Sequence, residues 1–249
     1  MLLLSACTGV MDGIYDEPEE QPKSIDGQLY IDASSWTDWY YIDLKALTTD
    51  ATRQQALQNV EQPYPIPFPE HSAPAVTDHS SIVGQTGLYA YWFDVWGAGI
   101  SVNEFRSFKA TNSQPAPADW TIAVHRDNVR TNGGAAYETA LTDINLFAPS
   151  REELASYAFT ADTWTEHDVW TDQSQMLNSL IGSQGIAINA VLSGWLQLDV
   201  PPMPPAFTHN SHVFVVRLSD GTYGALQLTN YLSPAGTKCC LTIRYKYPL

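Results

Sequence analysis

Period-two alternation of apolar and polar residues, rich in Val, Ile, Tyr, Phe and Trp, is the feature that most constrains the fold of this chain. Successive side chains of a β-strand point to opposite faces, so this period predicts strands with one buried face. Gly, Pro, Asn and Asp bound the alternating segments, as expected at turns. The predicted strands are Gln28 to Ala33, Trp39 to Leu44, Leu88 to Trp96, Phe105 to Ala110, Trp120 to His125, Gly185 to Ala190, Trp195 to Val200, His212 to Leu218, Tyr223 to Tyr231 and Cys240 to Tyr247.

Helical patterns are sparse. Ser150 followed by Glu153 forms a capping-box pattern that opens a short helix through Ala158, and a second helix is predicted over Thr52 to Val60. No internal repeat and no second linker interrupts the strands. The predicted fold class is therefore all-β, with a single antiparallel β-rich domain over residues 25–249 that contains few short helices.

The N-terminal segment resembles the end of a bacterial lipoprotein signal. Residues 1–7 read Met-Leu-Leu-Leu-Ser-Ala-Cys, and in such signals the Cys thiol takes up diacylglycerol. Cys7 is therefore the predicted lipidation site, and its acyl chains are the only expected contact with a membrane. The run is too short for a membrane span or a complete signal, which favours an upstream start codon. The alternative is a buried apolar N-terminus with an ordinary Cys.

Residues 8–24 are predicted to form an acidic flexible tether, because they offer almost nothing to bury. Five acidic side chains and Lys23 give this segment a charge of −4, which leaves −11 of the total −15 for the rest of the chain. An acidic run after a lipidated Cys also resembles the surface-export signal of Bacteroidota lipoproteins. We therefore expect an outer-membrane lipoprotein exposed at the cell surface, with extracellular release as a further location.

Charge and missing motifs exclude several classes of function. The chain has 27 acidic and 12 basic side chains and no two adjacent Lys or Arg, which argues against nucleic acid or an anionic lipid surface as the main partner. It contains no H-E-x-x-H, no G-x-S-x-G, no phosphate-binding Gly loop and no C-x-x-C. We therefore do not expect an enzyme, and a catalytic group assembled from distant loops is the disfavoured alternative.

Three small clusters of His and Cys have both functional and structural interpretations. Cys239 and Cys240 would face opposite ways on a strand, which favours a structural role over a redox or metal pair. His209 and His212 could share a metal in a loop, but on a strand they would point to opposite faces. His167 lies between two carboxylates, which would raise its basicity and suit a metal or haem, although an exposed polar loop is favoured.

Residues 120–134, with the sequence WTIAVHRDNVRTNGG, resemble the W-D-I-A-x-H-R-x-D-V-R-x-N-G-G signature of the HmuY family of haem-binding lipoproteins. Thr121 and Asn128 depart from it, since the signature has Asp at both positions. Further family-like segments follow in the same order at residues 193–196, 213–221, 226–231 and 241–248. The resemblance runs from about Gln28 to the C-terminus.

The resemblance implies a single all-β, haemophore-like domain that takes up intact haem and passes it to a TonB-dependent outer-membrane receptor, with host haemoproteins as possible further partners. The signature is mainly architectural in the family. His125 is therefore expected to be a hydrogen-bonded core residue rather than an iron ligand. Arg126 and Arg130 are expected to fix turns or pair with carboxylates rather than touch haem.

The founding member of the family holds haem iron with two His, one in a loop ahead of the Ser-Gly-Trp-Leu strand and one just after it. Here Val200 occupies the second position and cannot bind iron. Met203 lies three residues further on, between two Pro pairs, and Met176 lies in the upstream loop. Other members use a Met pair with a similar spacing. Met1 and Met11 lie in the signal and the tether, so the domain contains only Met176 and Met203.

Met176 and Met203 are therefore the predicted axial ligands of haem iron, and haem (iron protoporphyrin IX) is the predicted cofactor. An arbitrary Met pair is more often core filler, but both of these residues flank polar or Pro residues. A thioether is soft and uncharged, so it favours ferrous haem relative to His. The alternative function is a surface-exposed β-rich lipoprotein that binds a non-haem ligand, either a glycan or a host protein.

Overall fold

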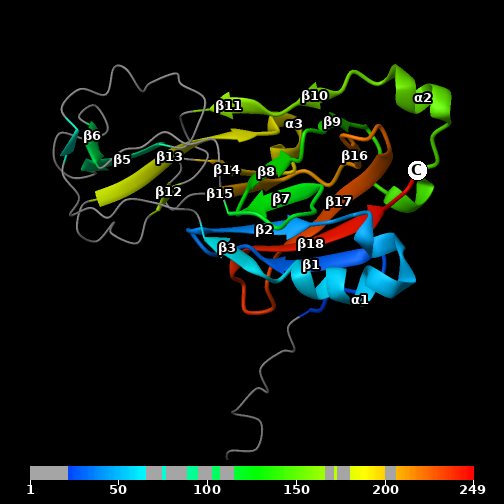
Figure 1. Cartoon of the computed structure of the whole chain (residues 1–249), viewed down its shortest axis with the longest axis horizontal. Helices are drawn as coiled ribbons and strands as arrows, with labels where there is room; N and C mark the ends of the chain where they lie inside the picture. Colours follow the sequence, from blue (N-terminus) through cyan, green and yellow to red (C-terminus); the bar gives the residue numbers. More distant parts are fainter. Residues whose placement is uncertain are drawn as a thin grey trace, which may run out of the picture.

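Antiparallel sheets dominate the fold, and its helices are short (Figure 1). The computed structural model describes residues 22–65, 75–76, 89–94, 103–106, 115–165, 171–172, 180–199 and 206–249. The all-β fold class is confirmed. Cys7 and most of the predicted tether lie outside the described residues. No helix in the described ranges is both long enough and apolar enough to span a bilayer.

One sheet has six strands and is built mainly from the C-terminal part of the chain, and we call it the six-stranded sheet below. Leu29 and Ile31 lie opposite Ile243 and Leu241 in register, and all four side chains are fully buried. The alternation in these strands therefore places one continuous apolar row on the inner face. In spatial order the strands are β1 (Gln28–Asp32), β18 (Lys238–Lys246), β17 (Tyr223–Leu232), β16 (Phe214–Arg217), β9 (Ala135–Glu138) and β10 (Thr160–Ala161).

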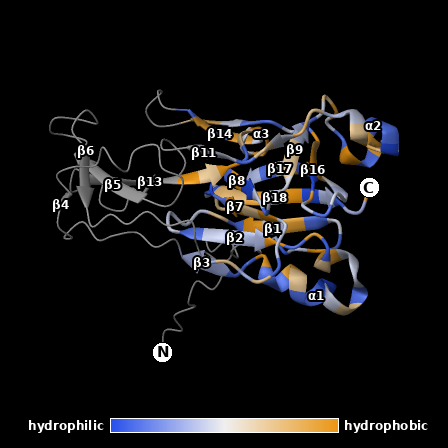
Figure 2. Ribbon diagram, turned by 45° about the horizontal axis from the view of Figure 1, so that its top comes forward, coloured by the Kyte–Doolittle hydropathy of each residue, from blue (hydrophilic) through white to orange (hydrophobic). Residues whose placement is uncertain are grey.

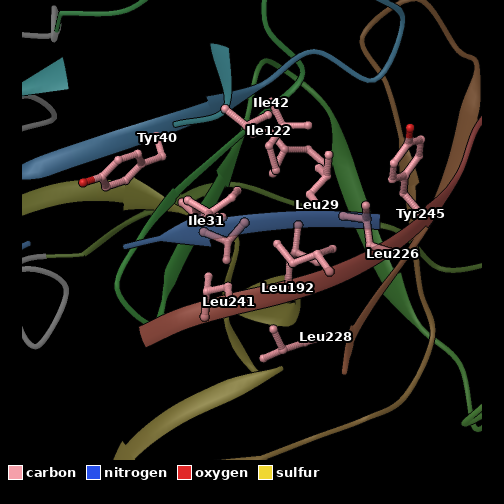
Figure 3. Packing of buried hydrophobic residues seen from close by; sticks show 14 of the residues in the cluster. Leu29, Ile31, Tyr40, Ile42, Ile122, Leu192, Leu226, Leu228, Leu241 and Tyr245 are labelled. Atoms are coloured by element: carbon pink, nitrogen blue, oxygen red, sulfur yellow. The ribbon is translucent and has the colours of Figure 1, made fainter. Parts of the chain in front are cut away.

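A four-stranded sheet packs its inner face against this six-stranded sheet. Its spatial order is β3 (Pro63–Pro65), β2 (Asp38–Ile42), β7 (Ile122–His125) and β8 (Asn128–Thr131). Ile42 and Ile122 from this sheet meet Leu29, Leu226 and neighbouring residues of the larger sheet in one buried cluster (Figure 3). This cluster is the main core of the protein.

The four-stranded sheet is also buried on its other face. Trp39, Tyr41 and Ala123 alternate with the core-facing residues and pack on Ile186 of β13 (Leu180–Ile188) in a second cluster. Burial on both faces explains why β2 and β7 are nearly continuous apolar runs rather than strictly alternating ones.

Two further sheets complete the strands. In the first, which also has six strands, β13 pairs with β5 (Tyr89–Asp94), β11 (Thr163–Thr165) and β12 (Thr171–Asp172), and β6 (Asn103–Arg106) and β4 (Ala75–Val76) follow beyond β5. The other is the hairpin of β14 (Leu196–Asp199) and β15 (Ala206–His209). The short helix α3 (Ala190–Ser193) connects β13 to β14.

The remaining described helices and turns pack on the sheets in two places. The turn η3 (Ile144–Leu146) and helix α2 (Arg151–Ser156) contribute Ile144 and Leu154 to a cluster on the outer face of the six-stranded sheet. The turn η1 (Ala46–Thr48) and helix α1 (Asp50–Asn59) contribute Leu47 and Ala56 to the main core. Both α1 and α2 carry mixed hydropathy, whereas hydrophobic residues run along the central strands (Figure 2).

The sequence-based prediction of elements was largely right in location and less so in extent. Ser150 caps α2, since its Oγ accepts a hydrogen bond from the Glu153 N–H at 3.1 Å, but the helix ends at Ser156 rather than Ala158. The strand predicted over Gly185 to Ala190 was partly wrong, because β13 begins at Leu180 and Ala190 already belongs to α3. Strands β8 and β9 were not predicted, nor were the short strands β3, β4, β10, β11, β12 and β15.

Candidate functional site

The two predicted iron ligands lie in the connections of two hairpins whose strands are described. Met176 and Met203 themselves lie outside the described residues. Strands β12 and β13 pair antiparallel, and residues 173–179, which include Met176, connect them. Strands β14 and β15 pair antiparallel, and residues 200–205, which include Met203, connect them.

A buried polar corner joins these two hairpins. After β13 the chain turns through α3 into β14, so both hairpins start from this corner (Figure 1). Asn189 is fully buried there, and its Oδ1 accepts a hydrogen bond from the Leu192 N–H at 3.0 Å, which caps α3. Its Nδ2 donates to the Thr160 carbonyl at 2.8 Å and to Asp162 Oδ1 at 3.1 Å.

Asp162 completes the corner from the other side. Its carboxylate accepts hydrogen bonds from the N–H of Thr131 at 2.8 Å and from the hydroxyl of Thr131 at 2.9 Å. Burial raises the pKa of Asp162, and the bonds from Thr131 and Asn189 oppose that rise. Hydrogen bonds through Asp162 therefore connect Thr131, at the end of β8, to Asn189, which lies between β13 and α3.

His125 lies inside the protein at the end of β7. The ring is fully buried, packs 5.5 Å from the ring of Trp39, and donates from Nδ1 to the Asp38 carbonyl at 2.8 Å. Burial lowers the pKa of His125 to about 3, so the imidazole is neutral at physiological pH. Its expected place as a hydrogen-bonded core residue is confirmed.

The turn between β7 and β8 is held by Arg126. Its backbone has a positive φ of 53°, its Nη1 donates to the Ser34 carbonyl at 2.6 Å, and its guanidinium lies 3.6 Å from the centroid of the Trp36 ring. Next to it, burial raises the pKa of Asp127 to about 6, while the Arg126 charge and the Leu198 N–H oppose that rise. The turn between β7 and β8 therefore contacts strand β14 through Asp127 and Leu198, and β14 leads to the connection that contains Met203.

Arg130 fills an aromatic box on the outer side of the four-stranded sheet. Its guanidinium lies 4.4 Å from the ring of Trp39 and 5.3 Å from that of Trp120, and its Nη2 donates to the hydroxyl of Tyr41. The Tyr41 hydroxyl in turn donates to the Pro115 carbonyl at 2.8 Å. Arg126 thus fixes a turn, as expected, whereas Arg130 packs among aromatic rings.

Gly133 and Gly134, the last two residues of the signature, also have a structural role. Gly133 has a φ of 67°, which side chains disfavour. A Cβ on Gly134 would lie 2.6 Å from the carbonyl oxygen of Arg217 on β16, a distance that real Cβ atoms do not tolerate. These two residues let the chain turn from β8 into β9 and pair closely with β16.

Aromatic side chains support the hairpin of β14 and β15. Phe207 on β15 stacks on Tyr231 of β17 at 5.8 Å between ring centroids, and Lys238 Nζ lies 5.1 Å from the Phe207 ring. His209 donates from Nε2 to the Leu228 carbonyl at 2.8 Å. Phe207 is the second residue of β15, and β15 begins directly after the connection that contains Met203. The stack on Tyr231 therefore holds the strand where it leaves that connection.

The other candidate clusters have structural partners. His212 pairs through Nδ1 with Glu138 at 2.7 Å, so it does not share a site with His209. Cys239 and Cys240 are free and buried, and they serve opposite faces of β18: Cys239 joins the main core, while the Cys240 thiol donates to Asp32 Oδ1 at 3.5 Å. His167 lies outside the described residues, and no group of three potential metal-binding side chains occurs within them.

Comparison with known families agrees with this architecture. Residues 35–245 match the family described as HmuY protein. The chain belongs to the HmuY family. No curated protein matches the chain.

Solved structures related to this HmuY-family chain cover nearly its whole length. A Bacteroides vulgatus protein, described as HmuY-like and heme-binding, is 27% identical with a TM-score of 0.57 and covers 92% of this chain and 97% of its own. Apo PinO from Porphyromonas gingivitis is 17% identical with a TM-score of 0.61, over 89% and 96% of the two chains. The apo HmuY analogue of Tannerella forsythia is 19% identical with a TM-score of 0.58, over 94% and 100%. The last two show the fold alone.

Sequence reasoning missed the polar corner and the aromatic stack beneath the Met203 connection. Asn is a preferred N-cap residue, and Asn189 directly precedes the apolar residues of α3. This pattern could have located the helix cap. No comparable signal marks Asp162 or Phe207, whose partners come from distant segments of the chain.

Proposed function

We propose that this protein is a haemophore-like lipoprotein that binds haem through Met176 and Met203 as the two axial ligands of the iron. The observation that carries the proposal is the HmuY family match over residues 35–245, in a chain whose β-rich domain contains only these two Met residues. Each of them falls in the connection of a separate hairpin, and both hairpins start from the corner at Asn189.

The chemistry of two thioethers suits this task. Thioether sulfur is a soft, neutral ligand that favours ferrous iron and raises the reduction potential relative to imidazole. The described residues supply the support: the Asn189 corner connects the two hairpins, and the stack of Phe207 on Tyr231 holds the strand that follows Met203.

The same proposal places the protein at the outer membrane, anchored through lipidated Cys7 and exposed at the cell surface or released from it. Haem captured there, directly or from host haemoproteins, passes to a TonB-dependent outer-membrane receptor. The acidic tether of residues 8–24 gives the domain reach from the membrane, and the acyl chains are its only membrane contact.

The deciding experiment is a haem titration of the wild type, Met176→Ala and Met203→Ala, each in the ferric and the ferrous state. The Soret band of the wild type should shift saturably, with tighter binding of ferrous haem. Each Ala variant should change the absorption spectrum and bind haem more weakly, by about tenfold or more, which corresponds to about 1.4 kcal/mol.

Two results would contradict the proposal in different ways. Wild-type protein without a saturable Soret shift in either redox state would remove haem as the ligand and favour a non-haem ligand such as a glycan or a host protein. Saturable binding with unchanged spectra in both Ala variants would keep haem but assign its iron to other residues.

A further inference from the structure

A groove lies between α1 and the four-stranded sheet, and none of the interactions described above occupies it. It consists of two adjoining hollows of about 370 and 310 Å³, which share Asp43, Ala118 and Asp119 as lining residues. All of its lining residues are described. We call it the α1 groove. Tyr41, Gln55, Asn59 and Tyr64 also line the larger hollow, and Lys45 and Trp120 also line the smaller one.

Aromatic rings form one wall of the α1 groove. Tyr64 and Trp120 each meet the buried Tyr41 edge-on, with 5.0 Å between ring centroids in both pairs. Tyr64 lines the larger hollow and Trp120 the smaller one, and both are only partly buried. Each hollow therefore has its own aromatic surface, and Tyr41 holds both rings in place.

The α1 groove is also lined by polar atoms with spare hydrogen-bonding capacity. Gln55 Nε2 donates to Asn59 Oδ1 at 2.8 Å, which leaves Gln55 Oε1 and Asn59 Nδ2 for another partner. Asp43 Oδ1 accepts the backbone N–H groups of Lys45 and Ala46, while no described residue donates to its Oδ2. Asp119 is exposed and likewise has no hydrogen-bond partner among the described residues.

Charge restricts the class of ligand. The larger hollow contains two carboxylates, Asp43 and Asp119, and its lining includes no Lys, Arg or His. The smaller hollow contains Lys45, but its ammonium is paired with Asp220 at 2.5 Å. An anionic ligand would therefore be repelled, and the many polar atoms make the groove unsuitable for a lipid chain.

We propose that the α1 groove binds a neutral oligosaccharide, with one sugar ring in each hollow. The apolar C–H face of a sugar ring packs on Tyr64 in one hollow and on Trp120 in the other. Adjacent hydroxyls of the sugar then donate to Gln55 Oε1 and to the carboxylates of Asp43 and Asp119, and Asn59 Nδ2 donates to a further hydroxyl. A few fixed polar groups beside a flat aromatic surface are the usual composition of such a small-ligand site.

The lining of the α1 groove includes neither of the two proposed iron ligands and no residue of the strands β12 to β15 that flank them. In both Figure 1 and Figure 2, α1 lies on the opposite side of the sheets from β14, the strand that leads to the Met203 connection. The proposal therefore holds whether or not the protein binds haem. It would allow the protein to stay attached to a glycan-coated surface while it handles another ligand.

The test measures binding of three neutral probes, maltohexaose, cellohexaose and the β-1,4-linked N-acetylglucosamine hexamer, by calorimetry and by Trp fluorescence. Wild-type protein should bind at least one of them with a Kd of about 1 mM or lower. Tyr64→Ala and Gln55→Ala should each weaken that binding about tenfold, or about 1.4 kcal/mol, whereas Tyr64→Phe should keep it within about twofold. Gln54→Ala is the matched control, because Gln54 is the exposed neighbour of Gln55 on α1 and does not line the groove.

Three results would overturn the proposal. The first is no binding of any of the three probes, and the second is binding that Tyr64→Ala leaves unchanged. The third is Tyr64-dependent binding of a hexalysine peptide without oligosaccharide binding, which would assign the groove to a cationic peptide. Folding of each variant is checked by its urea midpoint. The midpoint of Gln55→Ala should stay near that of the wild type because Gln55 is exposed, whereas that of Tyr64→Ala should fall modestly because the ring packs on Tyr41.

Discussion

Asn189 and Asp162 meet in a buried hydrogen bond of 3.1 Å at the corner from which both Met-bearing hairpins start. Asn189 uses its other polar atom to cap α3, and Asp162 binds both polar groups of Thr131 at the end of β8. This pair therefore helps to fix the direction in which β14 leaves β13. Through it, the four-stranded sheet is connected to the geometry of the two hairpins.

Asn189→Ala should lower the free energy of unfolding by about 2–4 kcal/mol. The change removes a helix cap, takes the Asn189 donor from the Thr160 carbonyl and leaves the Asp162 carboxylate with only its two donors from Thr131. The loss is measured by urea denaturation of the wild type and the variant.

A matched control for Asn189 is Gln227→Ala on the far side of the main core. Gln227 is also buried and makes three hydrogen bonds, to Ile144, Thr142 and Ser211, but it does not belong to the corner. Both variants should lose stability, and only Asn189→Ala should alter the spectrum of bound haem. Equal spectra for the two variants would show that the corner is not coupled to the iron ligands.

His125 should make the protein less stable in mild acid. Its pKa is about 3 in the folded state against 6.5 for a free His, so between these values the unfolded chain binds a proton that the folded protein excludes. This group alone lowers the free energy of unfolding by at most about 1.4 kcal/mol for each pH unit below 6.5. His125→Asn should remove this contribution, so that relative to the wild type the variant gains up to about 1.4 kcal/mol in the free energy of unfolding for each pH unit below 6.5. The measurement is urea denaturation from pH 4 to 7, and a pH dependence identical to that of the wild type would contradict the assignment.

Asp127 should act in the opposite direction over nearly the same range. Its folded pKa of about 6 exceeds the ordinary 3.8, so between these values the folded protein holds a proton that the unfolded chain releases. The two neighbours therefore largely cancel in the wild type. Asp127→Asn should expose the His125 effect and make stability fall more steeply with acid, by up to about 1.4 kcal/mol per pH unit. A slope as shallow as that of the wild type would show that Asp127 is ionised normally.

The alternation of apolar and polar residues identified the strands of the core sheets, because in these strands the apolar residues are the ones that become buried. Leu29 and Ile31 alternate with residues of the other face, and their partners Ile243 and Leu241 show the same alternation. Strand β8 was missed because Asn128 and Thr131 are polar residues that become buried through specific hydrogen bonds, which no hydrophobic period reveals. The start of β13 was missed because Gly182, Ser183 and Gln184 carry no alternating signal.

The sequence predicted some of the residues that support the candidate site, but not the contacts between distant segments that complete it. The family-like signature indicated a buried His125 and a turn fixed by Arg126, and both are present. The Asn189 corner and the α1 groove were not predictable, because each is assembled from segments that only the tertiary fold brings together. Tyr64 and Asp119, for example, line the same hollow from two segments separated by a long stretch of chain.

Replacing both proposed ligands with imidazole should convert an acid-resistant haem site into an acid-sensitive one. Thioether sulfur has no proton to gain in ordinary acid, whereas free imidazole protonates around a pKa of ~6.5 and then cannot bind iron. The wild type should therefore hold haem almost evenly from pH 7.5 to about 5, while the double variant Met176→His, Met203→His should lose haem as the pH falls through about 6.5 and should show a lower reduction potential. The measurement is the Soret absorbance during an acid titration, with the unfolding midpoint followed in parallel at each pH. Loss of haem from the wild type near pH 6 while the fold is intact would show that a titrating group, rather than two thioethers, holds the iron.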